Sequence, residues 1–210
     1  MGLKQAGFEV TGVDIEEQKE YPFSFVQSDV FKIDSSFLKE FDFIWASPPC
    51  QAYSIGTKGF RKNGKDYPDL IGRTRKLLLE TEVPFVIENV PGAPIRKDLC
   101  LIGPMFNLRV IKRRYFEIEG FKVRQPDIPQ YAGSVSTGEF VCTSTACVNP
   151  GCFGKRRDLQ KLYGSKWKEN NKIESWQEAL GIDWITNRKM LAEAIPPAYA
   201  KYIANAFLYC

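Results

Sequence analysis

The first half of the chain alternates between apolar runs and amphipathic stretches. Residues 69–81 carry apolar side chains at helical spacing, which predicts a helix there. Strands that alternate with helices are typical of a parallel sheet built from βαβ units, so the pattern predicts an α/β fold. The predicted strands, each a short apolar run, are residues 8–14, 23–27, 41–47 and 84–90.

Polar or reactive side chains stand at the ends of three of these strands. They are Asp14, the segment Pro48-Pro49-Cys50-Gln51, and Glu88-Asn89. Ligands of parallel sheets bind beyond the carboxyl ends of the strands. We therefore expect the three groups to gather along one edge.

The composition of the chain changes after about residue 120. Residues 121–155 are rich in Pro, Gly, Ser and Thr, and residues 156–206 have a helical pattern. This change predicts two parts: a main domain, residues 1–117 plus 176–210, and a small loop-rich and helical insert, residues 118–175.

Composition narrows the possible chemistry. The 210 residues contain no histidine, which excludes Ser-His-Asp and Cys-His catalysis, HExxH zinc proteases and His-ligated haem. Any reaction must use Cys, carboxylates, Lys or Arg, Tyr, or a bound cofactor. Six Cys are too few for a disulfide scaffold, and the sequence has no pattern of a signal peptide or a membrane span. We expect a reduced, cytoplasmic monomer without a membrane partner.

The net charge of +4 is unevenly distributed. Residues 1–50 carry four Lys against nine Asp or Glu, whereas residues 155–172 carry seven Lys or Arg against two acids. Positive charge on one segment suits a polyanionic partner, and a solvated basic helix gives the same pattern. Charge alone leaves both interpretations open.

Cys50 and Glu88 are the candidate reactive residues. A lone Cys is most often a small buried hydrophobe, but Cys50 follows two prolines in a rigid, irregular turn that would present its thiol outward. Glu88 follows an apolar run, where an unpaired carboxylate would be costly to bury. It either forms a salt bridge with Arg or Lys, or it is a protonated carboxyl that serves as an acid.

These residues resemble the motifs of the cytosine-C5 DNA methyltransferase family. Ser47-Pro48-Pro49-Cys50-Gln51 followed by Glu88-Asn89-Val90 is similar to the nucleophile and acid motifs of that family, in the same order. The compact chain looks most like small phage or prophage members. Weaker similarities to the second strand, the basic motif and the closing motif of the family lie at residues 6–14, 112–116 and 194–197.

The resemblance implies a Rossmann-like sheet that binds S-adenosylmethionine and acts on double-stranded DNA in a bacterial or phage-infected cell. In that family a cytosine is flipped out of the duplex, a Cys thiolate adds to C6 of the base, and C5 takes the methyl group.

The resemblance also assigns roles to individual residues. The catalytic residues would be Cys50, Glu88, Asn89 and Arg114. The cofactor-binding residues would be Asp14, Ile15, Asp29, Val30 and Pro48. The DNA contacts would be Gln51, Ser54, Lys58, Arg61, Lys62, Lys112, Arg156 and Arg157. Several of these stand in residues 55–67, which would be either the DNA-closing loop of the family or an ordinary solvated loop.

The chain also departs from the family pattern. The family begins with a strand and a Phe-x-Gly-x-Gly loop, and the resemblance starts only after that loop. We expect the first strand to be missing through a late start codon, a fragment or degeneration. Val110 and Lys112 stand where Gln and Arg are usual, and Ala192-Glu193 stands where Gly-Asn is usual. These departures weaken the prediction of cofactor binding more than the prediction that Cys50 and Glu88 act on the base.

Three functions remain open from the sequence. The first is DNA cytosine-5 methylation, as in restriction-modification systems. The second is DNA binding by a cofactor-defective relative, and the third is the same methylation on RNA.

A separate question is whether Cys142, Cys147 and Cys152, four residues apart, bind zinc. The fourth ligand would have to be Cys100, Cys210 or an acid, and we expect no metal there.

Overall fold

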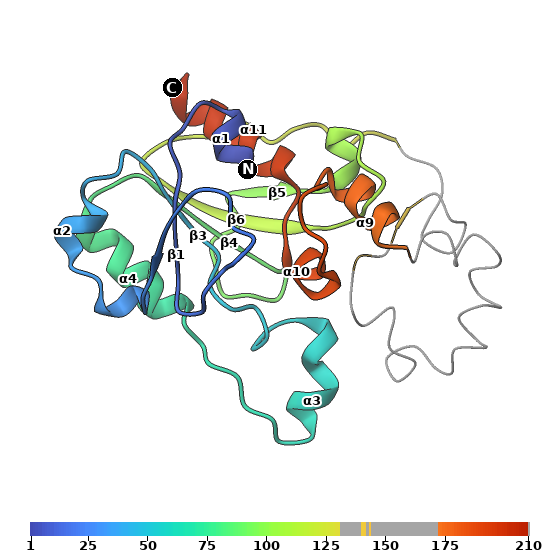
Figure 1. Ribbon diagram of the computed structural model, residues 1–210, viewed down its shortest axis with the longest axis horizontal. Coiled ribbons are helices and arrows are strands. Elements are labelled where there is room, and N and C mark those ends of the chain that lie inside the picture. Colours follow the sequence, from blue (N-terminus) through green and yellow to red (C-terminus); the bar gives the residue numbers. More distant parts are fainter. Residues whose placement is uncertain (131–139, 142, 144–171, 210) are drawn as a thin grey trace. The chain divides into compact units, whose positions relative to one another are not determined.

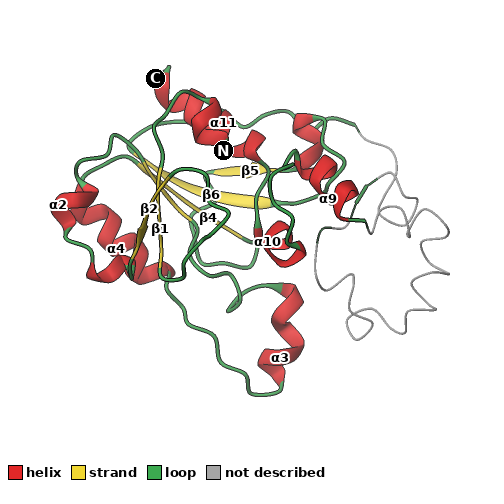
Figure 2. Cartoon of the chain, in the orientation of Figure 1, coloured by secondary structure: helices red, strands yellow, loops and turns green. Residues whose placement is uncertain are grey.

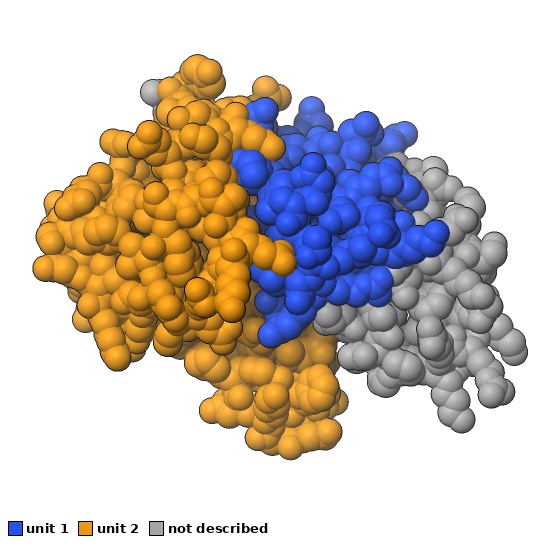
Figure 3. Space-filling model, viewed as in Figure 1, with its two compact units in different colours: residues 1–2, 101–113, 126–202 blue, residues 3–100, 114–125, 203–210 orange. Residues whose placement is uncertain are grey.

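The structure is a computed structural model that describes residues 1–130, 140, 141, 143 and 172–209. The chain forms two compact units (Figure 3). Unit 1 comprises residues 1–2, 101–113 and 126–202, and unit 2 comprises residues 3–100, 114–125 and 203–210. The division of the chain at residues 117 and 176 stays a prediction.

Short helices and strands follow one another along the chain (Figures 1 and 2). The strands are β1 (Thr11–Asp14), β2 (Ser24–Gln27), β3 (Ile44–Ala46), β4 (Phe85–Asn89), β5 (Leu99–Leu101) and β6 (Arg114–Glu119). The α-helices are α1 (Gly2–Gln5), α2 (Ser35–Leu38), α3 (Lys58–Lys62), α4 (Ile71–Thr81), α9 (Ile173–Leu180), α10 (Arg188–Glu193) and α11 (Pro197–Leu208). The 3-10 turns among the described residues are η1 (Val30–Lys32), η2 (Ile55–Thr57) and η3 (Gly103–Phe106). No helix in this described part is long and apolar enough to span a membrane.

The strands pair in two ladders. β1 and β2 are parallel, and the other four strands form a sheet in the order β3-β4-β6-β5. β3 and β4 are parallel, with Ala46 opposite Ile87. The four strands and the α4 helix expected from the apolar pattern are confirmed, as is the helix at the end of the chain.

The four-stranded sheet is mixed, because β6, a strand that the apolar pattern did not predict, is antiparallel to β4. A parallel return needs a crossover connection, usually a helix, and the link between β4 and β6 contains only β5 and η3. The β1–β2 ladder is also separate, since no strand in the described residues pairs with both β1 and β3.

The core of unit 2 lies between α4 and β4. Ile71 and Leu78 project from one face of α4 and pack with Phe85 and Ile87 of β4, all four side chains being buried. The α4 helix begins after Asp69, whose carboxylate accepts the amide of Ile71 at 3.2 Å, as helix-starting side chains do.

A second packing centre of unit 2 is made of phenylalanines from four distant segments. The ring of Phe207 lies 5.3 Å from those of Phe43 and Phe121 and 6.1 Å from that of Phe8, measured between centroids. These offset and edge-on contacts fasten the end of α11 to unit 2.

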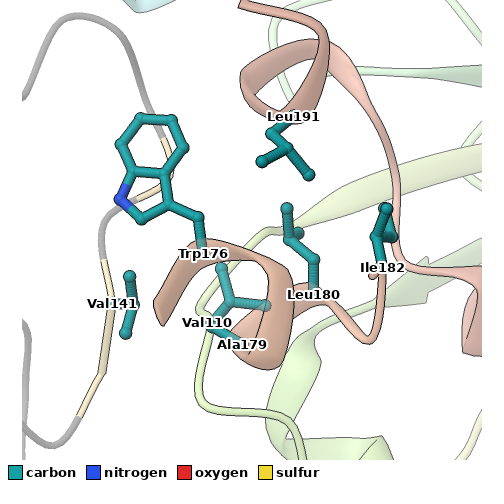
Figure 4. Close-up of a cluster of buried hydrophobic side chains, with 7 residues drawn as sticks. All are labelled: Val110, Val141, Trp176, Ala179, Leu180, Ile182 and Leu191. Atoms are coloured by element: carbon teal, nitrogen blue, oxygen red, sulfur yellow. The ribbon is translucent and has the colours of Figure 1, made fainter. Parts of the chain in front are cut away.

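The core of unit 1 is centred on α9 (Figure 4). Trp176 and Leu180 of α9 are fully buried and pack with Val110, Ile182 and Leu191. Gly103 of η3 has a backbone so close to Val110 that an added Cβ would overlap the Val110 carbonyl oxygen.

Candidate active site

The carboxyl ends of β3 and β4 bring Cys50 and Glu88 to neighbouring strand ends. Because β3 and β4 are parallel and Ala46 pairs with Ile87, Glu88 comes one residue beyond the last pair and Cys50 comes four residues beyond it. Cys50 is half-buried and not in a disulfide, so it is not the small buried hydrophobe of the first interpretation.

Asn89 joins the two strand ends. Its side-chain amide donates a hydrogen bond of 2.9 Å to the carbonyl oxygen of Pro48, and its own side-chain oxygen accepts the amide of Val90. Asn89 is only 1% exposed, so both bonds are made in a site from which water is excluded. The turn that carries Cys50 is thus fixed to the end of β4.

Glu88 forms a close ion pair with Arg114. The Nε of Arg114 lies 2.8 Å from Oε1 of Glu88, and both side chains are largely buried. The pair follows from the register of β4 and β6, which places Glu88 opposite Phe116. A salt bridge, one of the two interpretations of Glu88, is therefore present, and the cation sits where it can hold the carboxyl in one orientation.

The turn after Cys50 is closed by its own backbone. The carbonyl oxygen of Cys50 accepts the amides of Tyr53 and Ser54, at 3.0 and 2.9 Å. Ser54 then caps η2 by accepting the amide of Gly56 with its hydroxyl. Burial, together with the carboxylate of Asp69, raises the pKa of Tyr53 to about 12.

The segment after this turn consists of η2 and α3. It exposes the apolar side chains of Ile55 and Phe60, which are 87% and 56% exposed, and the cations of Lys58 and Lys62. Arg61 differs, because its guanidinium donates to the carbonyl oxygens of Gln51 and Ser54 at 2.7 and 2.9 Å.

Most residues expected to bind the cofactor lie at the ends of β1 and β2, and Pro48 follows β3. Asp14 ends β1, and its exposed carboxylate accepts the amide of Glu16. Asp29 follows β2 and accepts the amide of Phe31 at the start of η1, next to Val30. The side chain of Ile15 is 66% exposed. An exposed acid beside an exposed apolar side chain suits a ligand with both hydroxyl groups and a flat apolar ring.

Other predicted DNA contacts have different surroundings. Lys112 is 7% exposed and its ammonium donates to the carbonyl oxygen of Ala192 at 2.7 Å, so its charge is used inside unit 1. Arg156 and Arg157 lie outside the described residues. So do Cys142, Cys147, Cys152 and Cys210. Within the described part of the chain, no group of three or more His, Cys, Asp or Glu residues could hold a metal ion.

Two polar networks of the structure were not predicted from the sequence. One is the contact of Arg61 with the turn after Cys50. The other is Glu117 of β6, which is 1% exposed and receives two hydrogen bonds from Arg75, at 2.7 and 2.8 Å. The alternation of apolar and acidic residues over 116–119 could have indicated a strand, but it would have placed Glu117 on the solvent face, whereas Glu117 is buried together with Phe116 and Ile118.

A comparison with solved structures identifies the fold of the chain. A mutant of Spodoptera frugiperda DNMT2 has a solved structure similar to the chain, with a TM-score of 0.59 and 15% identity; the match covers 99% of this chain and 95% of that one. The chain therefore has a methyltransferase-type α/β fold, as expected. No curated protein matches the chain.

The family follows from the sequence itself. Residues 1–98 match the family model described as C-5 cytosine-specific DNA methylase. This range contains β1 to β4 with Cys50 and Glu88. Residues 1–98 thus belong to the C-5 cytosine-specific DNA methylase family, which confirms the family that the motifs resembled.

Proposed function

We propose that the protein is a DNA cytosine-5 methyltransferase that uses Cys50 as its nucleophile. The observation that carries this proposal is the placement of Cys50 and Glu88 at adjoining ends of the parallel strands β3 and β4, joined by the Asn89–Pro48 hydrogen bond. A nucleophile and an acid on rigid neighbouring elements can act on two positions of one flat ring.

The reaction needs three actions from the chain. The Cys50 thiolate forms a bond to C6 of the cytosine, and the electron pair of the C5–C6 double bond moves into the ring. Glu88, which Arg114 holds in place, acts in this step in its protonated form: it hydrogen-bonds N3 and supplies the proton that neutralises the ring. Once C5 carries the methyl group, a base removes the C5 proton, the C5–C6 double bond re-forms as the bond from Cys50 to C6 breaks, and N3 returns its proton to Glu88.

Asp14, Ile15, Asp29, Val30 and Pro48 would hold the cofactor. C-5 methyltransferases use S-adenosylmethionine, which supplies an electrophilic methyl group when bound. The exposed carboxylate of Asp14 suits the ribose hydroxyls, and Ile15 suits the face of the adenine ring.

DNA is the substrate we favour. The matching family model is one of DNA methylases, and the exposed Lys58 and Lys62 next to the Cys50 turn suit phosphate contacts. Methylation of RNA, or DNA binding without transfer, are the alternatives that the experiment must separate.

The decisive test is methyl transfer from labelled S-adenosylmethionine to DNA and to RNA, side by side. We expect label in DNA from the native chain and none from Cys50→Ala. Label in RNA alone would identify RNA as the substrate. DNA binding without cofactor binding would mean that the protein binds DNA but does not methylate it.

A second test traps the Cys50 bond. DNA with 5-fluorocytosine at the target should form a stable adduct after methyl transfer, because fluorine cannot leave as the C5 proton does. Mass spectrometry should place the adduct on Cys50. An adduct on another cysteine would refute the assignment.

A further inference from the structure

We propose that Arg61 is a positioning residue that fixes the turn carrying Cys50, and that it does not serve as a phosphate contact. This inference rests on the proposed function, and it replaces the DNA-contact role that the sequence resemblance gave to Arg61.

The guanidinium of Arg61 contacts the backbone of the segment that follows Cys50. A single nitrogen, Nη1, donates to the carbonyl oxygens of Gln51 and Ser54 at 2.7 and 2.9 Å and also contacts the hydroxyl of Thr57. Arg61 is half-buried, whereas Lys58 and Lys62 on the same helix are exposed. The charge of Arg61 is thus directed inward to the protein backbone.

The two carbonyls belong to the turn that carries Cys50. Gln51 lies inside this turn and Ser54 ends it, since the Cys50 carbonyl accepts the amides of Tyr53 and Ser54. The hydroxyl of Thr57 donates to the same two oxygens, at 2.6 and 3.0 Å. Two donors, Arg61 of α3 and Thr57 of η2, therefore converge on two carbonyls that lie one and four residues after Cys50.

The hydrogen bonds of Arg61 should affect the reaction because they hold the turn that carries Cys50. Hydrogen bonds from a cation to a carbonyl are among the stronger ones, and they fix the direction of the peptide groups on either side of the turn. A displacement of about 1 Å in a reacting group can slow a reaction about 100-fold. Loss of Arg61 should therefore act on the chemical step, through the position of the Cys50 thiol.

The experiment compares Arg61→Ala with Lys62→Ala, which removes the same charge from the adjacent, exposed position. Single-turnover methyl transfer is measured at saturating DNA, and DNA affinity is measured against salt concentration. Arg61→Ala should lower the single-turnover rate about 10- to 100-fold and leave the salt slope of DNA binding as in the native chain. Lys62→Ala should instead weaken DNA binding and reduce the salt slope by about 1.

Thr57→Val supplies a second variant with a smaller change. It removes the hydroxyl that donates to the same carbonyls, so it should slow transfer in the same direction as Arg61→Ala. The double variant should lose less than the product of the two single effects, because both donors hold one turn. Thermal unfolding of each variant shows that it is folded before its rate is measured.

Two outcomes would overturn the proposal. One is an unchanged single-turnover rate in Arg61→Ala, and the other is a salt slope that falls as it does in Lys62→Ala. If the native chain transfers no methyl group, the proposed function fails, and Arg61 is tested by the alkylation of Cys50 with iodoacetamide. Mapping by mass spectrometry, with Cys100 as internal reference, should show at least a threefold change in the Cys50 rate in Arg61→Ala; no change refutes the positioning role.

Discussion

The side-chain amide of Asn89 donates a hydrogen bond of 2.9 Å to the carbonyl oxygen of Pro48, two residues before Cys50. This bond crosses between the ends of β3 and β4, and it is made where Asn89 is almost fully buried. It links the segment that carries the nucleophile to the strand that carries the acid. The position of Cys50 relative to Glu88 should therefore be sensitive to the loss of the Asn89 side-chain amide.

Asn89→Asp tests this bond directly. The variant keeps an oxygen for the amide of Val90 but sets a carboxylate oxygen against the Pro48 carbonyl, where an amide donor is needed. We expect a loss of about 1–3 kcal/mol in the free energy of unfolding and at least a tenfold loss of methyl transfer. Denaturant unfolding and single-turnover rates measure the two effects. Asn63→Asp, at an exposed helix end, is the matched control for stability, and an equal loss there would contradict the role of the Pro48 bond.

The side chains of Glu88 and Arg114 should have a large coupling free energy in the folded protein. Both side chains are largely buried, so removal of either one leaves a charge in a site with little water. A double-mutant cycle of Glu88→Gln and Arg114→Met should give a coupling free energy of about 1–3 kcal/mol. Because the pair is buried, the coupling should change little in high salt.

The pair of Lys76 and Glu80 on α4 is the matched control for that cycle. Its charged atoms are 4.0 Å apart and its side chains are 80% and 58% exposed. The same cycle there should give no more than about 0.5 kcal/mol. Equal coupling in the two pairs would show that burial contributes nothing to the Glu88 pair.

The apolar pattern was enough to predict β1 to β4 and α4, because each is a local feature with its own period. The position of Cys50 near Glu88 also followed from the sequence, since neighbouring parallel strands end at one edge. The pairing of β6 with β4 did not, because register between distant strands depends on the connection between them. Arg114 was expected among the catalytic residues, and only the β4–β6 register shows that it meets Glu88.

The Arg61 network was missed for a different reason. A basic residue in a Gly- and Lys-rich segment looks like a phosphate contact whenever its charge is considered alone. Whether the guanidinium faces solvent or backbone depends on how the segment folds back. That fold depends on the Ser54 cap and on the hydrogen bonds of the Cys50 carbonyl, which no periodicity reveals.

Glu117 should make the stability of the protein depend on pH in the acid range. Burial alone would raise the pKa of Glu117, but hydrogen bonds from Arg75 and from the amide of Arg96 outweigh it and leave the pKa below its ordinary value. A carboxyl with a lowered pKa in the folded state adds stability above its unfolded pKa of about 4.3. That stability is lost as the pH falls from there through the folded pKa.

The variant Glu117→Gln tests this pH dependence. At neutral pH it should cost about 3 kcal/mol, because Arg75 keeps a partly buried charge without its partner. Its free energy of unfolding should fall less steeply than that of the native chain below pH 4.3. Glu119→Gln is the control, since Glu119 is 42% exposed and contacts Arg96, and it should cost less than about 1 kcal/mol. A native chain whose stability is flat between pH 5 and pH 3 would refute the prediction.

Phe207 should be the residue through which the end of α11 stabilises unit 2. Its ring contacts those of Phe8, Phe43 and Phe121, which come from three other segments of the chain. Phe207→Ala should cost about 1–2 kcal/mol, because it removes ring contacts with three other segments from a half-buried position. Leu208→Ala, at the next position with a side chain 47% exposed, should cost less than about 0.5 kcal/mol. Denaturant unfolding of the two variants measures the difference, and equal losses would mean that the aromatic cluster does not hold the end of α11.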